Sequence, residues 1–368
     1  MEIVTYIMLA FAVVGAVDRI IGNKLGLGAE FEKGAHLLGA MFLSMTGMLV
    51  LSPVISSLLS GIGNVFPSFL DFSIIPSIFI ANDLGAVAIA KGLAKSQEIA
   101  LFNGLVVAST IGATISFSLP YAMERADKKH HKNILFGFLC GIVTVPLSVF
   151  VGGLVSGIEI VTLLLDIVPL VIICAILAFC LVKFEKATVK VFKVFGLIIK
   201  AVITVGLVIG IIQFLTESTI IEGTEDFIVA NEVILNAACF MAGAFPLLFV
   251  LKKLLVKPLG ALGKKMGINP TSSVGFLASS ASFVLQCDNY DEMDEKGVVL
   301  NSAFAVSGAF AFVGHLAFTM AVEPSYLPAV LVTKLLGGVL AVALAYFLYK
   351  NREKKEKQNE NNCPQSRS

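Results

Sequence analysis

Long apolar stretches recur along the chain from its first residues to about residue 349. About nine of them reach the roughly 20 residues that a helix needs to cross a lipid bilayer. They lie near 3–21, 35–59, 99–122, 134–156, 160–182, 194–215, 229–251, 298–321 and 327–349. The first has neither a basic leader nor a small-residue cleavage site, so we interpret it as a spanning helix rather than a signal peptide. The pattern predicts an all-α polytopic membrane protein.

Composition agrees with this prediction. Hydrophobic residues make up 57% of the chain, charged residues only 14%, and the mean hydropathy is +0.90. A typical soluble domain carries about 25% charged residues. The net charge of +1 gives no basic surface of the kind that binds nucleic acid, so the expected surroundings are a lipid bilayer.

The loops between the apolar stretches differ sharply in their content of Lys and Arg. Loops 124–132, 183–193 and 252–265 are rich in basic residues, whereas 60–71, 157–159, 216–230 and 322–326 have none. Cytoplasmic loops carry the excess of Lys and Arg. We therefore expect the first set in the cytoplasm, the second outside, the N-terminus outside and the basic C-terminus in the cytoplasm.

Two further apolar segments, 72–93 and 271–287, are short or interrupted. If 271–287 crossed the membrane, the basic tail would end on the outer side, so this segment must enter and leave on one side. The same argument applies to 72–93. We expect two re-entrant hairpins, which are tolerated at membrane depth only where protein or a water-filled cavity satisfies their backbone.

The two halves of the chain resemble each other at an offset of about 198 residues, the separation of Asn103 and Asn301. An odd number of crossings separates matching helices, so the repeats are predicted to be inverted. Inverted repeats are typical of secondary transporters, with a midplane site between them. We divide the chain into repeat 1 (1–157), a connecting helix and loop (158–193), repeat 2 (194–349) and a disordered cytoplasmic tail (350–368).

Asn82 and Asp83 interrupt the apolar segment 72–93. An Asp at the centre of a membrane helix costs roughly 2.5–3.5 kcal/mol, so it marks a functional site by default. Asp83 is then a counter-ion for a bound cation, with the Asn82 amide beside it. The alternative is that Asp83 caps a helix beginning at Leu84.

The second hairpin supplies hydroxyl and amide groups where the first supplies a carboxylate. Ser279, Ser280 and Ser282 suit a small polar ligand, although serines are also common where membrane helices pack closely. Gln286 ends this hairpin and could belong to the site or to a helix interface.

Matching polar residues also occur in the two spans that follow the hairpins. Asn103 and Asn301 could brace their hairpins or touch a ligand, and Ser307 corresponds to Ser109. Thr110 and Thr114 lie about one turn apart on one helix face. Their hydroxyls could contact a ligand or bond to their own backbone.

His315 lies well inside an apolar stretch and could relay protons, bind a ligand or be satisfied by a neighbouring helix. His130 and His131 are expected to be solvated, and Asp166 to lie near the lipid headgroups. The cysteines form no CxxC pair and are expected to be small buried thiols. No metal or cofactor is expected, and the motifs HExxH, GxSxG and GxxxxGK[ST] are absent, which argues against an enzyme.

Four segments resemble the ethanolamine-utilisation permease family EutH. They read GAHLLGAMFLSMTGMLVLSPV (34–54), ANDLGAVAIAKGLA (81–94), NSAFAVSGAFAFVGHLAF (301–318) and VTKLLGGVLAVA (332–343). The resemblance implies a bacterial plasma-membrane protein that admits ethanolamine, with Asp83 matching the family's Asp. It departs at Gly314, where an acidic residue is expected in some members, and this weakens a proton-relay role for His315.

Three functions remain open at this point. The first is an ethanolamine permease in which Asp83 pairs the ammonium group. The second is a transporter of another small amine or cation, with or without ion coupling. The third is a membrane scaffold or sensor that binds ethanolamine without moving it. A homo-oligomer is compatible with each of them.

Overall fold

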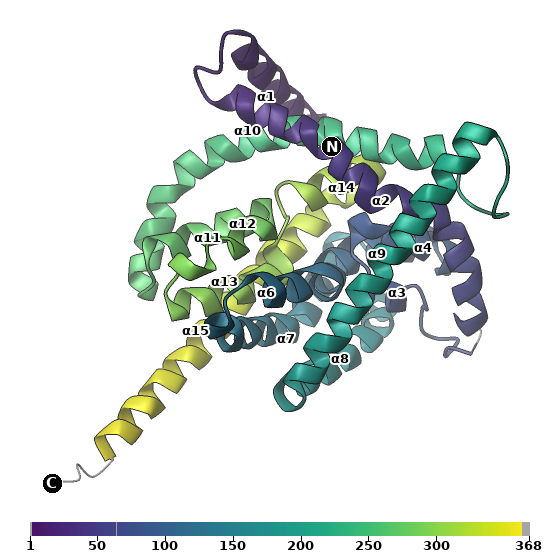
Figure 1. Cartoon of the computed structure of the whole chain (residues 1–368). Helices are drawn as coiled ribbons and strands as arrows, with labels where there is room; N and C mark the ends of the chain where they lie inside the picture. The colour runs from purple at the N-terminus through teal and green to yellow at the C-terminus, as the bar shows by residue number, and fades with distance from the viewer. Residues whose placement is uncertain (1, 64, 363–368) are drawn as a thin grey trace.

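The computed structural model describes residues 2–63 and 65–362, and all regular structure in that part of the chain is helical (Figure 1). Eight helical stretches are long and apolar enough to cross a membrane, which confirms a polytopic membrane protein. They are α1 (Glu2–Ile20), α2 (Leu27–Gly63), the stretch Gln97–Arg125, α7 (His131–Val155), α8 (Ile160–Lys183), α9 (Glu185–Thr216), α10 (Phe227–Met266) and α15 (Leu327–Asn362). Each coincides with one of the predicted spans.

The predicted span 298–321 is not a continuous helix. It consists of α13 (Glu295–Gly308) and α14 (Gly314–Val322), separated by five residues around Phe310, which has a left-handed backbone with φ +60°. The freed amides of Phe310 and Phe312 donate to the carbonyls of Ser279 and Ser280, each at 2.9 Å. The break is stable because the second hairpin accepts hydrogen bonds that the helix no longer makes.

Both interrupted segments consist of short helices joined by a turn. The first contains α3 (Ile74–Phe79), the 3₁₀ turn η1 (Asn82–Leu84) and α4 (Ala86–Leu93), with Gly85 at φ +93° between the last two. The second contains α11 (Pro270–Ala281) and α12 (Phe283–Cys287), separated by Ser282 in an extended conformation. Their re-entry into a membrane stays a prediction.

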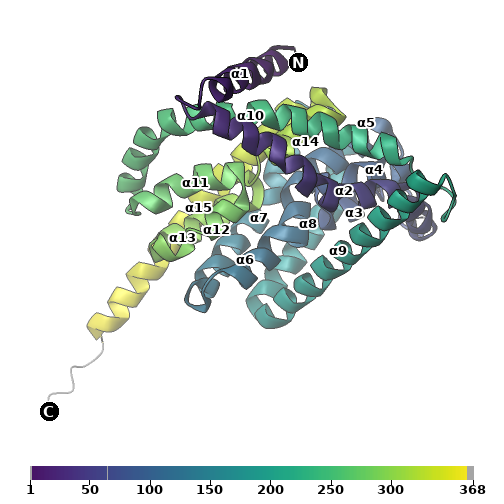
Figure 2. The same ribbon diagram turned by 45° about the horizontal axis from the view of Figure 1, so that its top comes forward.

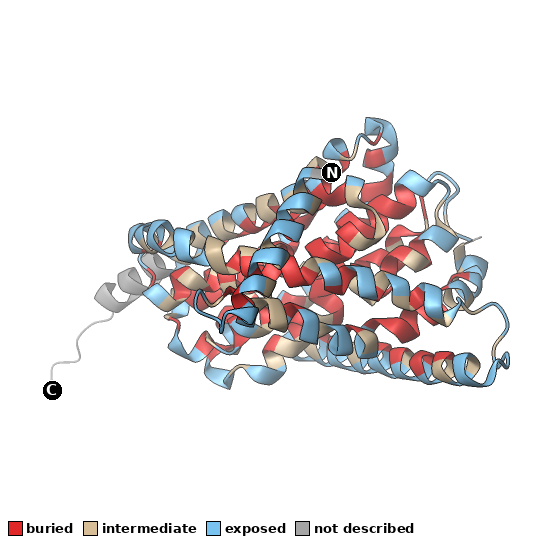
Figure 3. Ribbon diagram, turned by 90° about the horizontal axis from the view of Figure 1, so that it is seen from above, coloured by how far each residue is buried: buried red, intermediate tan, exposed pale blue. Residues whose placement is uncertain are grey.

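The stretch Gln97–Arg125 forms the centre of the molecule. It runs through α5 (Gln97–Leu101), two π-helical segments η2 (Phe102–Gly112) and η3 (Thr114–Ser118), and α6 (Leu119–Arg125). All of its most apolar 18-residue window is buried, compared with 17% of the corresponding window of α1. Figure 3 shows the same contrast, with buried helices inside and exposed faces at the edge. Exposed apolar faces on peripheral helices are expected where lipid replaces water.

The helices pack in pairs that match across the predicted repeat. Gly47 of α2 lies against the Ile203 carbonyl of α9, and Gly243 of α10 lies against the Met8 carbonyl of α1. Both glycines allow the two helix backbones to touch, as small residues do in membrane helix pairs. Because α1 corresponds to α9 and α2 to α10, these contacts support the predicted repeat, with α8 as the connector.

The C-terminal part of the chain differs from the predicted disordered tail 350–368. Helix α15 continues to Asn362 and projects away from the other helices (Figure 2). The Glu, Lys and Arg residues that follow Lys350 have high helix propensity, which favours this continuation of the helix. Residues 363–368, which include Cys363, lie outside the described part of the chain.

Candidate functional site

Asp83 lies at the tip of the first hairpin, where the backbone turns between α3 and α4. Gly85, not Asp83, is the N-cap residue of α4, so the structure does not use this carboxylate as the cap of that helix. The Asp83 side chain keeps 34% of its surface exposed, whereas Asn82 beside it is completely buried. Among the described residues, neither amide atom of Asn82 has a hydrogen-bond partner. The hairpin tip therefore presents an accessible carboxylate and a free amide.

Among the described residues, His315 lies close to this carboxylate and Lys334 interacts with it electrostatically. The Nε2 atom of His315, in α14, lies 3.9 Å from Oδ1 of Asp83. Lys334, in α15, interacts electrostatically with both residues and donates from Nζ to the Ser109 carbonyl at 2.5 Å. Both side chains are only 1% exposed. Four elements, η1, η2, α14 and α15, thus converge on one polar cluster.

Sequence reasoning did not identify Lys334. It is the only Lys or Arg between Leu327 and Tyr349, in a predicted span. A charged residue inside a span is the same signal that identified Asp83, and it would have identified Lys334 as well.

The serines of the second hairpin reach the cluster through the backbone. Phe310, whose amide donates to the Ser279 carbonyl, accepts from the His315 amide and packs its ring 5.1 Å from the imidazole. The Ser279 hydroxyl is buried and has no hydrogen-bond partner among the described residues. The Ser280 hydroxyl instead donates to the Phe276 carbonyl, and Ser282 is partly buried at the break. Ser279 is therefore the serine of this hairpin whose hydroxyl is both buried and unpartnered among the described residues.

Gln286 lies in a network that joins α12 to α13. Its side-chain amide donates to the Tyr290 hydroxyl at 2.7 Å, which contacts the Ser302 hydroxyl at 2.9 Å. All three residues are buried at 1% exposure or less. Of the two readings of Gln286, the structure favours a helix interface.

Asn103 and Asn301 brace their hairpins. The Asn103 amide donates to the Ser73 hydroxyl at 3.0 Å and to Asp166 at 3.2 Å. The Asn301 amide donates to the carbonyls of Ser272 and Gly297. Asp166 is only 2% exposed, because Asn103 donates to its carboxylate inside the protein. Its place near the headgroups stays a prediction.

The hydroxyls of Thr110 and Thr114 are both occupied by backbone carbonyls. Thr110 donates to Val107, one turn earlier, and Thr114 donates across to Val306 of α13 at 3.0 Å. Ser307 is buried against Gly337 of α15, and no described residue is hydrogen-bonded to its hydroxyl. Thr114 thus joins the two predicted repeats at the centre of the molecule.

Two apolar cavities approach this region from different helices. The first, of about 330 Å³, lies between α2, α10, α11 and α12 and reaches Leu277, Ala278 and Ala281. The second, of about 390 Å³, lies between α2, α4, α10 and α14 and reaches Val87, Ala88 and Phe318. The first is lined by Ala278, which precedes Ser279 in the chain, and the second by Val87 and Phe318, which follow Asp83 and His315 by about one helical turn. The residues that line the two cavities come largely from corresponding parts of the two predicted repeats.

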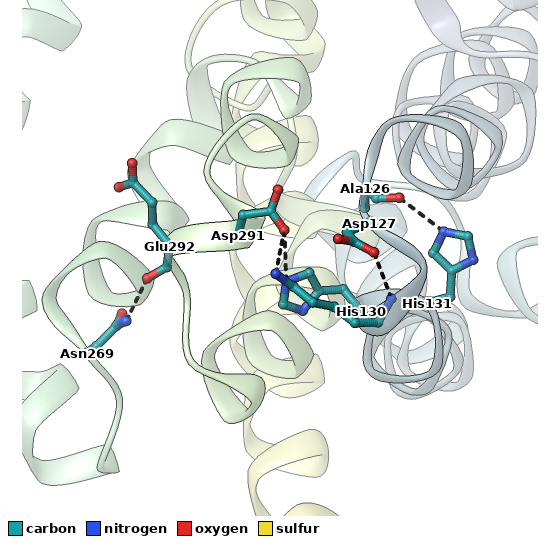
Figure 4. A network of polar contacts seen from close by, with 8 residues as sticks. Ala126, Asp127, His130, His131, Asn269, Asp291 and Glu292 are labelled. Carbon is teal, nitrogen blue, oxygen red and sulfur yellow. Dashed lines mark hydrogen bonds and ion pairs between the residues drawn. The ribbon is translucent and has the colours of Figure 1, made fainter.

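Polar loops tie the second hairpin to the end of α6 and the start of α7. Asp291 lies 3.2 Å from both Lys129 and His130 (Figure 4). Arg125 lies 3.0 Å from Asp288. The hydrogen bond from Lys129 holds the pKa of Asp291 below its usual range. The His130 side chain is only 7% exposed, so the expectation that it is solvated was wrong.

The cysteines are reduced in the described part of the chain. Cys140, Cys174 and Cys287 are buried as expected, whereas Cys239 is exposed and Cys180 is partly exposed. Exposure on a spanning helix is compatible with a small apolar thiol facing lipid. No group of three His, Cys, Asp or Glu residues that could hold a metal ion occurs within residues 2–63 and 65–362.

The chain was then compared with known proteins. A family model described as "Ethanolamine utilisation protein, EutH" matches residues 1–348. The chain is 38% identical to "Probable ethanolamine permease EutH" of Listeria monocytogenes, over 98% of this chain and 97% of that protein. It is 32% identical to the protein of that name in Escherichia coli, over 94% and 95% of the two chains, and 32% identical to "Uncharacterized protein YxeR" of Bacillus subtilis, over 94% of each.

No solved structure matches the chain. The family match nevertheless covers every spanning helix and every residue of the polar cluster around Asp83. This protein, with its two interrupted hairpins and broken span, belongs to the EutH ethanolamine utilisation family.

Proposed function

We propose that this protein is a permease that moves ethanolamine across a bacterial plasma membrane. The observation that carries the proposal is the carboxylate of Asp83, which stays partly exposed at a hairpin tip while Asn82 and His315 beside it are buried. Such a carboxylate suits the ammonium group of ethanolamine, and the names of the relatives give that substrate.

The site we propose lies near the membrane midplane, between two inverted repeats. Asp83 pairs the ammonium group. Unpartnered polar atoms of Asn82, Ser279 and Ser307 are available for the hydroxyl of the substrate. A buried polar atom without a partner costs free energy, so a ligand that satisfies it is stabilised.

Access to this site uses the two apolar cavities in turn. The first is bordered by Glu30, Lys252 and Lys253, the two lysines in a basic segment assigned to the cytoplasm. The second is bordered by Lys91 and by Glu225, which lies in a segment assigned to the outside. Together with the positive-inside rule, this supports an external N-terminus and a cytoplasmic C-terminus. Ethanolamine enters through one cavity and leaves through the other as the hairpins move.

Uptake of labelled ethanolamine into proteoliposomes tests the proposal. Asp83→Asn removes the charge without changing the shape and is expected to abolish saturable uptake. Asp127→Asn, the same change in an exposed loop, is the matched control and is expected to transport normally. If Asp83→Asn transports as well as the unchanged protein, the counter-ion role fails. Binding without flux in the unchanged protein would favour a sensor instead.

A further inference from the structure

Lys334 brings a second primary amine, one that belongs to the protein, to the polar cluster around Asp83. Its side chain is 1% exposed, and its Nζ donates to the Ser109 carbonyl of η2 at 2.5 Å. An ammonium has three protons to donate, and the Ser109 carbonyl accepts one of them. The charged or titratable groups that interact with Lys334 electrostatically are Asp83 of η1 and His315 of α14.

This arrangement determines how much charge the site can hold. With Lys334 protonated, its charge and that of Asp83 cancel before any substrate arrives. An added ethanolammonium would leave the buried cluster with one uncompensated positive charge, which is costly in a low-dielectric interior. The amine of lysine is the same chemical group as that of ethanolamine, a primary amine on a methylene chain. The two therefore compete for one carboxylate.

We propose that Lys334 is the resident ammonium of the site, so that each ethanolamine crosses the membrane with no net movement of charge. This inference rests on the proposed permease function. When ethanolammonium pairs with Asp83, an N–H bond of Lys334 breaks and the proton passes to water on the entry side. When the substrate leaves, Lys334 takes a proton from water on the exit side. The sum is one ammonium inward and one proton outward, equal to one neutral amine.

The unchanged, full-length protein in proteoliposomes gives the first test. A tenfold potassium gradient with valinomycin sets about 59 mV, inside negative, and a solute that crosses as a unit cation would accumulate about tenfold. We expect no such accumulation of labelled ethanolamine above protein-free liposomes at equal pH. When the interior is one pH unit more acidic, we expect about tenfold accumulation of labelled ethanolamine, reached faster than in protein-free liposomes. Tenfold accumulation driven by the potential alone would overturn the proposal.

Two substitutions at one position give a second test. Arginine cannot release its proton at physiological pH, so Lys334→Arg is expected to lose transport although the charge is kept. Lys334→Met removes the resident charge, so ethanolammonium then crosses as a cation and its uptake becomes driven by the potential. Lys183→Met, the same change on an exposed face of α8, is the control and should behave like the unchanged protein. Transport by Lys334→Arg at the normal rate would overturn the proposal.

These results distinguish failure of the permease function from failure of the role of Lys334. If the unchanged protein gives no flux of ethanolamine under any gradient, the proposed function itself fails. If it gives saturable flux that follows the membrane potential, the permease stands and the role of Lys334 fails. The measurement on the unchanged protein does not depend on whether either variant folds.

Discussion

Replacing Gly47 of α2 by alanine should destabilise the protein, whereas the same replacement at Gly39 of that helix should stabilise it. A Cβ atom at Gly47 would lie 2.8 Å from the Ile203 carbonyl carbon of α9 and closer still to the carbonyl oxygen. At Gly39, no heavy atom of the described residues comes within 4 Å of the added carbon. Both replacements add one methyl group to α2, and only the space available for that group differs.

The expected magnitudes follow from two opposing terms. Alanine is favoured over glycine inside a helix by about 1 kcal/mol. Overpacking costs about 1–3 kcal/mol, and backbone atoms of α9 cannot rotate away as a side chain can, so we take the upper end. The expected net effects are about 1 kcal/mol of stabilisation for Gly39→Ala and about 2 kcal/mol of destabilisation for Gly47→Ala.

Equilibrium unfolding in mixed detergent micelles measures both free energies. Gly243→Ala in α10, against the Met8 backbone, should behave like Gly47→Ala if the repeat is real, with Gly260→Ala as the open control in the same helix. Equal stabilisation by Gly47→Ala and Gly39→Ala would refute the close contact of α2 with α9.

Three further predictions concern contacts around the hairpins. Asn103→Ala should destabilise the protein by about 2 kcal/mol, because it leaves the buried Asp166 carboxylate without its amide donor. In the same unfolding assay, the double replacement of Asn103 and Asp166 by alanine should cost less than the sum of the two single replacements. Phe310→Gly should be more stable than Phe310→Ala by about 1 kcal/mol, the reverse of the order within a helix, because only glycine adopts φ +60° without strain; equal stabilities would contradict the left-handed backbone. Asp291→Asn should lower stability near pH 6 but not at acid pH, because Lys129 depresses the pKa of Asp291. The contribution of the Asp291 carboxylate to stability is complete above its usual pKa of 3.8 and disappears as the pH falls through the depressed pKa. The unfolding midpoints of Asp291→Asn and of the unchanged protein should therefore converge as the pH falls. A difference that stays the same at every pH would refute the ion pair.

Much of the fold follows from the spacing of apolar residues. Eight spans, both interrupted hairpins and the position of Asp83 at a hairpin tip could be predicted, because each depends on composition within a short window. The repeat could be predicted from pairs such as Asn103 and Asn301, whose amides brace equivalent hairpin starts.

The remaining features depend on contacts between distant residues. The break at Phe310 has no proline and depends on carbonyls of Ser279 and Ser280, about 30 residues earlier. The burial of Asp166 depends on Asn103, 63 positions away, which donates to its carboxylate. Lys334 differs from these two residues. Its charge inside a predicted span is visible in the sequence, and only its partner, the Ser109 carbonyl, had to come from the structure.

The break between α13 and α14 makes the two predicted repeats unequal at the position where they meet. In repeat 2, two backbone hydrogen bonds attach the span to its hairpin, so both must shift as one body. In repeat 1, the corresponding span is a continuous, partly π-helical rod. Inverted halves of equal construction would give inward-open and outward-open conformers of similar free energy. In the carrier that we propose, the halves differ in construction, so we expect the two conformers to differ in free energy and the empty carrier to rest on one side of the membrane.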